Sequence, residues 1–408
     1  MNNIRIFKNT TYQALARIAT SGIGFLIAIV LARNFGASGY GEYIKITSFV
    51  SLFYLISDFG LNAIFLQAER KDLKFKDLFY LRILISLVLF ALVNVIAVML
   101  PYQKDLGFGF SPSVKFGIFI FSFSLFAQAI LFSQSVIFQK KLRFDFLTKA
   151  LTAGSALSLV FIVIFSYSSF PLIFILLSLL IGDFFSAFLA LLFAKEKIFP
   201  FSFGVKASKE LISKAFPLGL MLVFNLVYFR IDSLIIASYK SAHDVGIYAL
   251  SFLFFDFLLS IPLFLSNSIY PTLLSNRENK NEFSKLVKKY AFVYLGLSLI
   301  LAVPFWFVSP LFFLIKPEFA NAIYPFRILL LGLPFFFLTS FFQWILIAFK
   351  KTGYLVRVYF FLMCANVLLN LIFVPKGSYI ASAFITGICE VFVFVLLFYK
   401  LVLLKKNN

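Results

Sequence analysis

Residues 78–100 read LFYLRILISLVLFALVNVIAVML, an apolar run whose one charged residue is Arg82. A helix needs roughly 20 such residues to cross a hydrocarbon core of ~30 Å. Two lysines, Lys74 and Lys76, stand immediately before the run. Because lysine and arginine accumulate on the cytoplasmic side of membrane helices, the stretch predicts a membrane span that begins there.

Similar runs continue on both sides of this one. The whole chain is 62% hydrophobic and 13% charged, far from the roughly 45–50% and 25% of soluble domains. The pattern predicts an all-α integral membrane protein with about twelve transmembrane helices. The expected spans are residues 11–33, 40–66, 78–100, 115–138, 147–168, 171–194, 212–239, 246–274, 289–308, 325–349, 354–374 and 379–402.

Lysines and arginines gather in every second connection. The amino-terminal tail, the even-numbered connections and the carboxyl-terminal end hold 23 of them, whereas the odd-numbered connections hold six. By the positive-inside rule both termini are cytoplasmic. The net charge of +20 is explained by cations that lie beside anionic lipid headgroups on the cytoplasmic side. It does not indicate binding to a nucleic acid.

The connections exclude several functions. None is longer than about 20 residues, so the chain lacks room for a soluble catalytic domain. It has no Gly-x-x-x-x-Gly-Lys-Ser/Thr loop for a nucleotide, and its one histidine, His243, lies in a short turn. Cys364 and Cys389 lie inside spans without metal-ligand spacing. We therefore predict no enzymatic activity, no metal and no cofactor, with coupling to H⁺ or Na⁺ left open.

The two halves of the chain resemble each other at an offset of about 205–211 residues. Tyr40-Gly41-Glu42-Tyr43 matches Val245-Gly246-Ile247-Tyr248, and Asp183 matches Glu390. An even number of spans per half makes the repeats parallel, related by an axis along the membrane normal. The expected architecture is two six-helix bundles, residues 1–200 and 201–408, around a central cavity.

Several segments in order resemble bacterial polysaccharide flippases, the Wzx-type O-antigen and capsule exporters of the multidrug/oligosaccharidyl-lipid/polysaccharide exporter superfamily. They are Leu31 to Gly36, Gly39 to Tyr43, Ser57 to Leu61, Phe216 to Gly219, Arg230 to Asp232, Val245 to Tyr248, Ala322 to Leu331 and Asn366 to Pro375. One departure is the short link Lys376 to Tyr379, where the family has a longer glycine-rich segment.

The resemblance implies a fold similar to that of the MATE multidrug exporters. It also implies that the chain moves an undecaprenyl-pyrophosphate-linked oligosaccharide, an O-antigen or capsule repeat unit, to the outer leaflet of the bacterial inner membrane by alternating access. The implied partners are this substrate, membrane lipids and a polysaccharide polymerase. A polar cavity is required because a pyrophosphate and sugars cannot cross hydrocarbon unaided.

Two alternatives remain open. A cation-coupled multidrug exporter of the same fold would have a cavity dominated by acids, whereas each acid within a span here has a cationic neighbour or lies near an end. A membrane glycan polymerase or ligase would have a large external loop, and the chain has none.

Ionisable residues inside spans are the candidate binding residues. Arg17 shares a polar helix face with Gln13 and Thr20, and both Arg17 and Asp58 lie about 10–12 Å from the cytoplasmic surface, so they are predicted to pair. Arg230 and Asp256 are likewise predicted at similar depths in their spans, nearer the outer surface. Asp232 is roughly 200° around the helix from Arg230 and is expected to point elsewhere.

These pairs have two interpretations. They either fix helix packing as buried ion pairs, or their arginines face the cavity and bind the diphosphate. The secondary candidates are Asp183 and Glu390, expected at the lipid-facing or cytoplasmic side of their spans, with Gln13 and Asn225. Arg82 is expected to extend to the cytoplasmic surface, and residues 310–324 to form a short interfacial helix or re-entrant turn.

Overall fold

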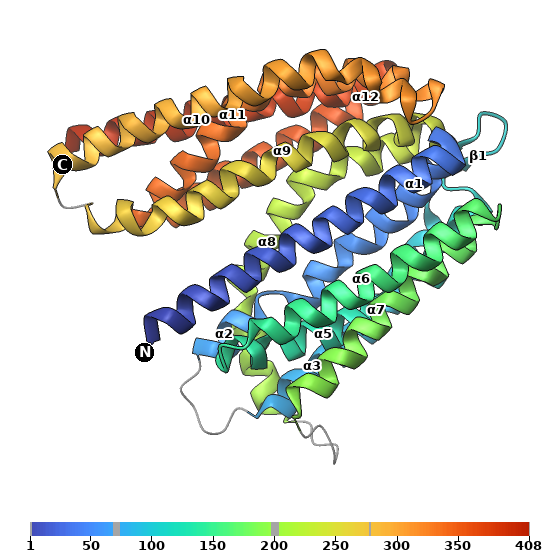
Figure 1. The fold of residues 1–408 in the computed structure, drawn as a ribbon, viewed down its shortest axis with the longest axis horizontal. Helices are drawn as coiled ribbons and strands as arrows, with labels where there is room; N and C mark the ends of the chain where they lie inside the picture. The colour runs from blue at the N-terminus through green and yellow to red at the C-terminus, as the bar shows by residue number, and fades with distance from the viewer. Residues whose placement is uncertain (1, 68–73, 197–203, 277–278, 408) are drawn as a thin grey trace. The chain divides into compact units, whose positions relative to one another are not determined.

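The computed structural model of the chain describes residues 2–67, 74–196, 204–276 and 279–407. This part is almost entirely helical, with one short antiparallel pair formed by β1 (Tyr102–Gln103) and β2 (Phe108–Gly109) (Figure 1). The helices are α1 (Asn2–Asp58), α2 (Leu61–Gln67), α3 (Phe75–Met99), α4 (Pro112–Phe121), α5 (Ser124–Lys140), α6 (Phe144–Tyr167), α7 (Leu172–Ala194), α8 (Val205–Tyr239), α9 (Ala242–Ser275), α10 (Lys280–Val308), η1 (Ser309–Leu314), η2 (Pro317–Ala322), α11 (Ile323–Ala348) and α12 (Thr352–Asn407).

The predicted fold class is confirmed. Nine helical segments of the described chain are long and apolar enough to cross a membrane. Two of them contain a non-helical residue that divides the segment, Gly36 in α1 and Ser378 in α12. With both divided, and with the 35-residue helix α8 counted, the described part contains the twelve spans expected.

The breaks in the helices follow from local chemistry. Gly36 has φ 69°, a left-handed conformation that glycine adopts at little cost. The expected span 115–138 is instead two helices, α4 and α5, because Ser122 and Ser124 each bond a carbonyl oxygen three residues earlier. Residues 309–322 form the two short 3₁₀ helices η1 and η2 between α10 and α11.

The chain forms two compact units, Met1–Leu226 and Val227–Asn408. Helix α8 contributes to both, so the predicted bundles 1–200 and 201–408 stay a prediction. In the first unit, small side chains allow α5, α6 and α7 to pack closely. Its buried core there consists of Ala127, Leu131, Ile137, Phe138, Ala150, Ala187, Ala190 and Ala194.

The second unit has an aromatic core. Phe255 of α9 meets Phe336 of α11 edge-to-face, and Tyr294 of α10 stacks on Phe341 of α11. All four rings are buried. Such pairs add roughly 0.5–1.5 kcal/mol each beyond the area they bury, and they join three helices of this unit.

Candidate functional site

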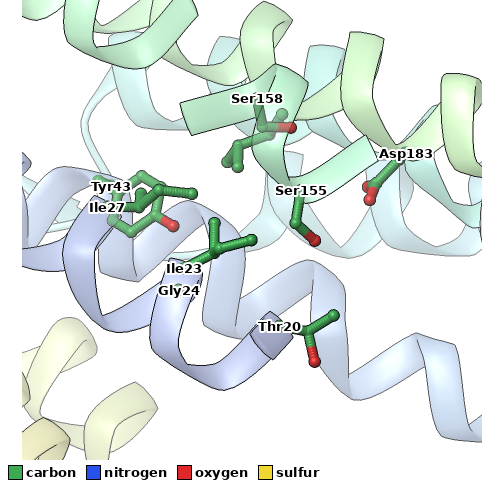
Figure 2. Close-up of a pocket in the computed structure, with 9 residues that line it drawn as sticks. Thr20, Ile23, Gly24, Ile27, Tyr43, Ser155, Ser158 and Asp183 are labelled. Carbon is green, nitrogen blue, oxygen red and sulfur yellow. The ribbon is translucent and has the colours of Figure 1, made fainter. Parts of the chain in front are cut away.

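A partly open cavity of about 190 Å³ lies within the first unit. We call it the Asp183 cavity (Figure 2). Helix α1 supplies one side and helices α6 and α7 supply the other. Its lining residues are Thr20, Ile23, Gly24, Ile27, Tyr43, Ser155, Ser158, Leu179 and Asp183.

The wall formed by α6 and α7 depends on a reciprocal contact of small residues. A Cβ atom on Gly154 would overlap with Ser186 and with the Gly182 carbonyl group, and one on Gly182 would overlap with Ser158 and with the Gly154 carbonyl group. The two backbones can approach this closely only because both positions are glycine. Asp183 follows Gly182 directly, so this crossing fixes the place of its carboxyl group.

Asp183 directs its carboxyl group toward the cavity from the middle of α7 (Figure 2). Its expected place at the lipid-facing or cytoplasmic side is therefore wrong. Among the described residues, none forms a hydrogen bond or an ion pair with this carboxyl group. The Ser155 hydroxyl group lies beside the same space, and Thr20 lines it from α1. The cavity thus presents an acidic and hydroxyl-rich surface.

A second polar cluster, the Arg82 network, lies where α3 meets the end of α1. Arg82 donates to Asp58 at 2.9 Å and to Asn62 at 2.8 Å. It also bonds the Ser57 carbonyl oxygen and the Ser133 hydroxyl group, each at 3.3 Å. The side chain of Arg82 has no exposed surface, so its expected extension to the cytoplasmic surface is wrong.

The sequence predicts Arg17 as the partner of Asp58, whereas the partner that the structure describes is Arg82. The side chains of Arg17, Gln13 and Asn225 lie outside the described residues. The predicted depth of Asp58 within its span was sufficient to predict that its partner is a cation. Depth alone could not choose between Arg17 and Arg82, because the sequence places both near the same predicted ends of their spans.

The predicted pairing of Arg230 with Asp256 is confirmed. Their side chains approach to 3.6 Å and are 44% and 54% exposed. Asp232 points elsewhere, as expected from its place on the helix: it is buried and accepts hydrogen bonds from Tyr248 and from the Ser233 amide at 2.7 Å. The Arg230 pair is therefore accessible, and Asp232 belongs to the interior of the second unit.

Glu390 is buried in the second unit, away from both ends of α12. It accepts hydrogen bonds from the Tyr228 hydroxyl group at 3.1 Å and from Thr339. Its expected place at a lipid-facing or cytoplasmic side is wrong. Elsewhere in α12, Asn370 accepts a hydrogen bond from Ser382 at 2.7 Å.

The surroundings of two acids of the second unit, Asp232 and Glu390, therefore differ from the expectation. The sequence indicates cationic neighbours or helix ends for the acids, but Asp232 and Glu390 are satisfied by hydroxyl groups. Tyrosine and threonine can do this in an apolar interior without adding a second charge. Within the described part, no three His, Cys, Asp or Glu side chains gather closely enough to hold a metal ion.

The fold is shared with solved membrane transporters. A structure described as lipid II flippase MurJ, inward closed conformation, has a TM-score of 0.79 at 17% identity, covering 95% of this chain and 87% of that chain. An inward-facing multidrug resistance MATE family transporter of the MOP superfamily has a TM-score of 0.77 at 11% identity, covering 98% and 99%. A MOP superfamily transporter from Pyrococcus furiosus has a TM-score of 0.56 at 13% identity, covering 98% and 95%. No curated protein sequence matches the chain.

The chain therefore has the fold of these solved membrane transporters. The model of the MatE family also matches residues 217–372. The model of the family described as polysaccharide biosynthesis protein matches residues 6–276, about two thirds of the sequence. The chain belongs to this polysaccharide biosynthesis protein family.

Proposed function

We propose that the chain is a flippase for an undecaprenyl-pyrophosphate-linked oligosaccharide, an O-antigen or capsule repeat unit. It moves this substrate from the cytoplasmic to the outer leaflet of the bacterial inner membrane by alternating access of its two units. The observation that carries the proposal is the family match over residues 6–276 in a chain with this transporter fold.

The accessible arginine of the second unit supports an anionic substrate. Arg230 is partly exposed and contacts Asp256 at 3.6 Å, longer than a close ion pair, so its guanidinium group keeps hydrogen-bond donors free for a phosphate. A planar guanidinium group can bind two phosphate oxygens at once. In this proposal Arg230 binds the diphosphate while the prenyl chain stays in lipid, and Arg17 stays the alternative candidate that the sequence predicts.

A cation-coupled multidrug exporter is the second candidate. The Asp183 cavity favours it, because a carboxyl group without a described partner is suited to a cationic ligand. The match of the MatE model to residues 217–372 is compatible with either function.

Deleting the gene from its host separates the two functions. A flippase predicts loss of surface glycan and accumulation of the lipid-linked oligosaccharide in the cytoplasmic leaflet, with drug sensitivity unchanged. Re-expression of the chain restores the glycan. Unchanged surface glycan together with increased sensitivity to cationic drugs would support the exporter and contradict the flippase.

A further inference from the structure

The Asp183 cavity combines three kinds of surface that a sugar ring requires. Asp183 provides a carboxyl group, and Thr20, Tyr43, Ser155 and Ser158 provide hydroxyl groups. Apolar surface comes from Ile23, Ile27 and Leu179. In Figure 2, Asp183 of α7 and Ser155 of α6 lie on one side of the space, and Thr20 of α1 lies on the other. Polar and apolar surfaces therefore border one small volume.

The size of the cavity limits its ligand. Its volume of about 190 Å³ is below the roughly 300–1,000 Å³ of pockets for drug-sized molecules. Helices α6 and α7 cannot approach each other more closely, because Gly154 and Gly182 already lie in direct contact with the opposing helix. A single small polar unit fits this space better than a large aromatic cation.

The chemistry of the lining favours a neutral sugar. The Asp183 carboxyl group accepts no hydrogen bond from the described residues, and leaving a partly buried acceptor unpaired is unfavourable. Neighbouring hydroxyl groups of a pyranose can donate to both carboxyl oxygens, while its C–H face packs on isoleucine and leucine. A quaternary organic cation would pair with the carboxyl group but has no donor or acceptor for the neighbouring Ser155 hydroxyl group.

We infer that the Asp183 cavity is a subsite for one neutral sugar ring of the substrate's glycan. The inference rests on the proposed function, since a lipid-linked oligosaccharide supplies the ring. Asp183 accepts hydrogen bonds from two sugar hydroxyl groups, and Ser155 supplies a further polar contact. The subsite is separate from Arg230, which lies in the other unit.

The test measures how much a sugar adds to carrier affinity. The purified full chain in detergent is titrated with undecaprenyl pyrophosphate alone, and with the same carrier bearing N-acetylglucosamine or galactose. The variants are Asp183→Ala, Asp183→Asn and Ser155→Ala. Ser178→Ala is the matched control, because Ser178 is a buried serine of α7 that bonds its own helix at Phe174 and does not line the cavity.

We expect the wild type to bind at least one sugar-bearing carrier about tenfold more tightly than the bare carrier, the scale of a hydrogen bond to a charged group. Asp183→Ala removes this preference and keeps affinity for the bare carrier within about twofold. Asp183→Asn and Ser155→Ala retain part of the preference, and Ser178→Ala retains all of it. If Asp183→Ala does not fold, Asp183→Asn and Ser155→Ala provide the test.

Other outcomes overturn the inference in distinguishable ways. If Asp183→Ala and Ser155→Ala keep the sugar preference of the wild type, the cavity is not a sugar subsite. Equal affinity of the wild type for all three carriers leads to the same conclusion. Neither result contradicts the proposed flippase function. No binding of any carrier by the wild type contradicts the proposed function itself. Loss of tetraphenylphosphonium binding in Asp183→Asn, with carrier preference unchanged, would assign the cavity to organic cations.

Discussion

At the scale of single residues, Arg82 shows how a charge is accommodated at membrane depth. Its guanidinium group reaches Asp58, Asn62, Ser133 and the Ser57 carbonyl oxygen, so the charge is both paired and hydrogen-bonded. The sequence predicted that Asp58 pairs with a cation. It could not predict how each helix is rotated about its own axis, and therefore which cation faces Asp58. That rotation, fixed by packing, brings Arg82 to Asp58.

Substitution of Arg82 tests this network. Arg82→Ala leaves the half-buried Asp58 carboxylate without a described cation, so we expect a loss of about 3 kcal/mol in the free energy of unfolding. The double variant Arg82→Ala with Asp58→Ala loses less, because no unpaired charge remains. Thermal unfolding in detergent measures both. Equal destabilisation by the single and double variants would contradict this account.

The role of Arg230 is tested by export. Arg230→Lys keeps the charge and loses the planar fork, so we expect partial surface glycan, and Arg230→Ala abolishes it with normal protein in the membrane. Lys141→Ala is the control, since Lys141 is an exposed cation bonded to Glu196 outside the candidate sites. If Asp256→Ala restored export to Arg230→Ala, the pair would serve packing and not the substrate.

At the scale of helices, α6 and α7 determine the shape of the Asp183 cavity. Apolar runs predicted both helices, with ends within a few residues of those observed. Their crossing point could not be predicted from hydrophobicity, because it depends on matching Gly154 and Gly182 with Ser186 and Ser158. A glycine and a serine four residues apart on each helix are the sequence signal for such a contact.

Gly182→Ala tests the crossing. The added methyl group overlaps with Ser158 and with the Gly154 carbonyl group, so the helices must separate, and we expect a lower midpoint of thermal unfolding. Ser158→Gly does not restore it, because the carbonyl group remains. Gly296→Ala of α10 is the control, since a Cβ atom there meets nothing within 4 Å. If Gly182→Ala and Gly296→Ala had the same midpoint of thermal unfolding, the close contact between α6 and α7 would be contradicted.

At the scale of the whole molecule, the number of spans and the class of protein were predictable because they depend on run length and composition. The partners of Asp232 and Glu390 were not predictable, since they depend on packing in three dimensions: Asp232 binds Tyr248, and Glu390 binds Tyr228 and Thr339. Positive φ at Ser378 was also unexpected, because serine rarely adopts this conformation.

The orientation of the chain stays a prediction of its charge pattern. We expect both termini in the cytoplasm, from 23 lysines and arginines on one side against six on the other. Alkaline phosphatase fused after Asn408 should be inactive, and the same enzyme inserted at Tyr167 should be active. The reverse pattern at either position would overturn the topology.

Translocation of a lipid-linked glycan by the purified chain tests the central claim most directly. The chain is reconstituted into liposomes with a fluorescent undecaprenyl-pyrophosphate oligosaccharide, and a membrane-impermeant quencher reports the fraction in the outer leaflet. We predict that wild-type protein makes nearly all of the substrate accessible within minutes, whereas Arg230→Ala leaves it at the level of protein-free vesicles. Equal accessibility with and without the wild-type protein would contradict the assignment as a flippase.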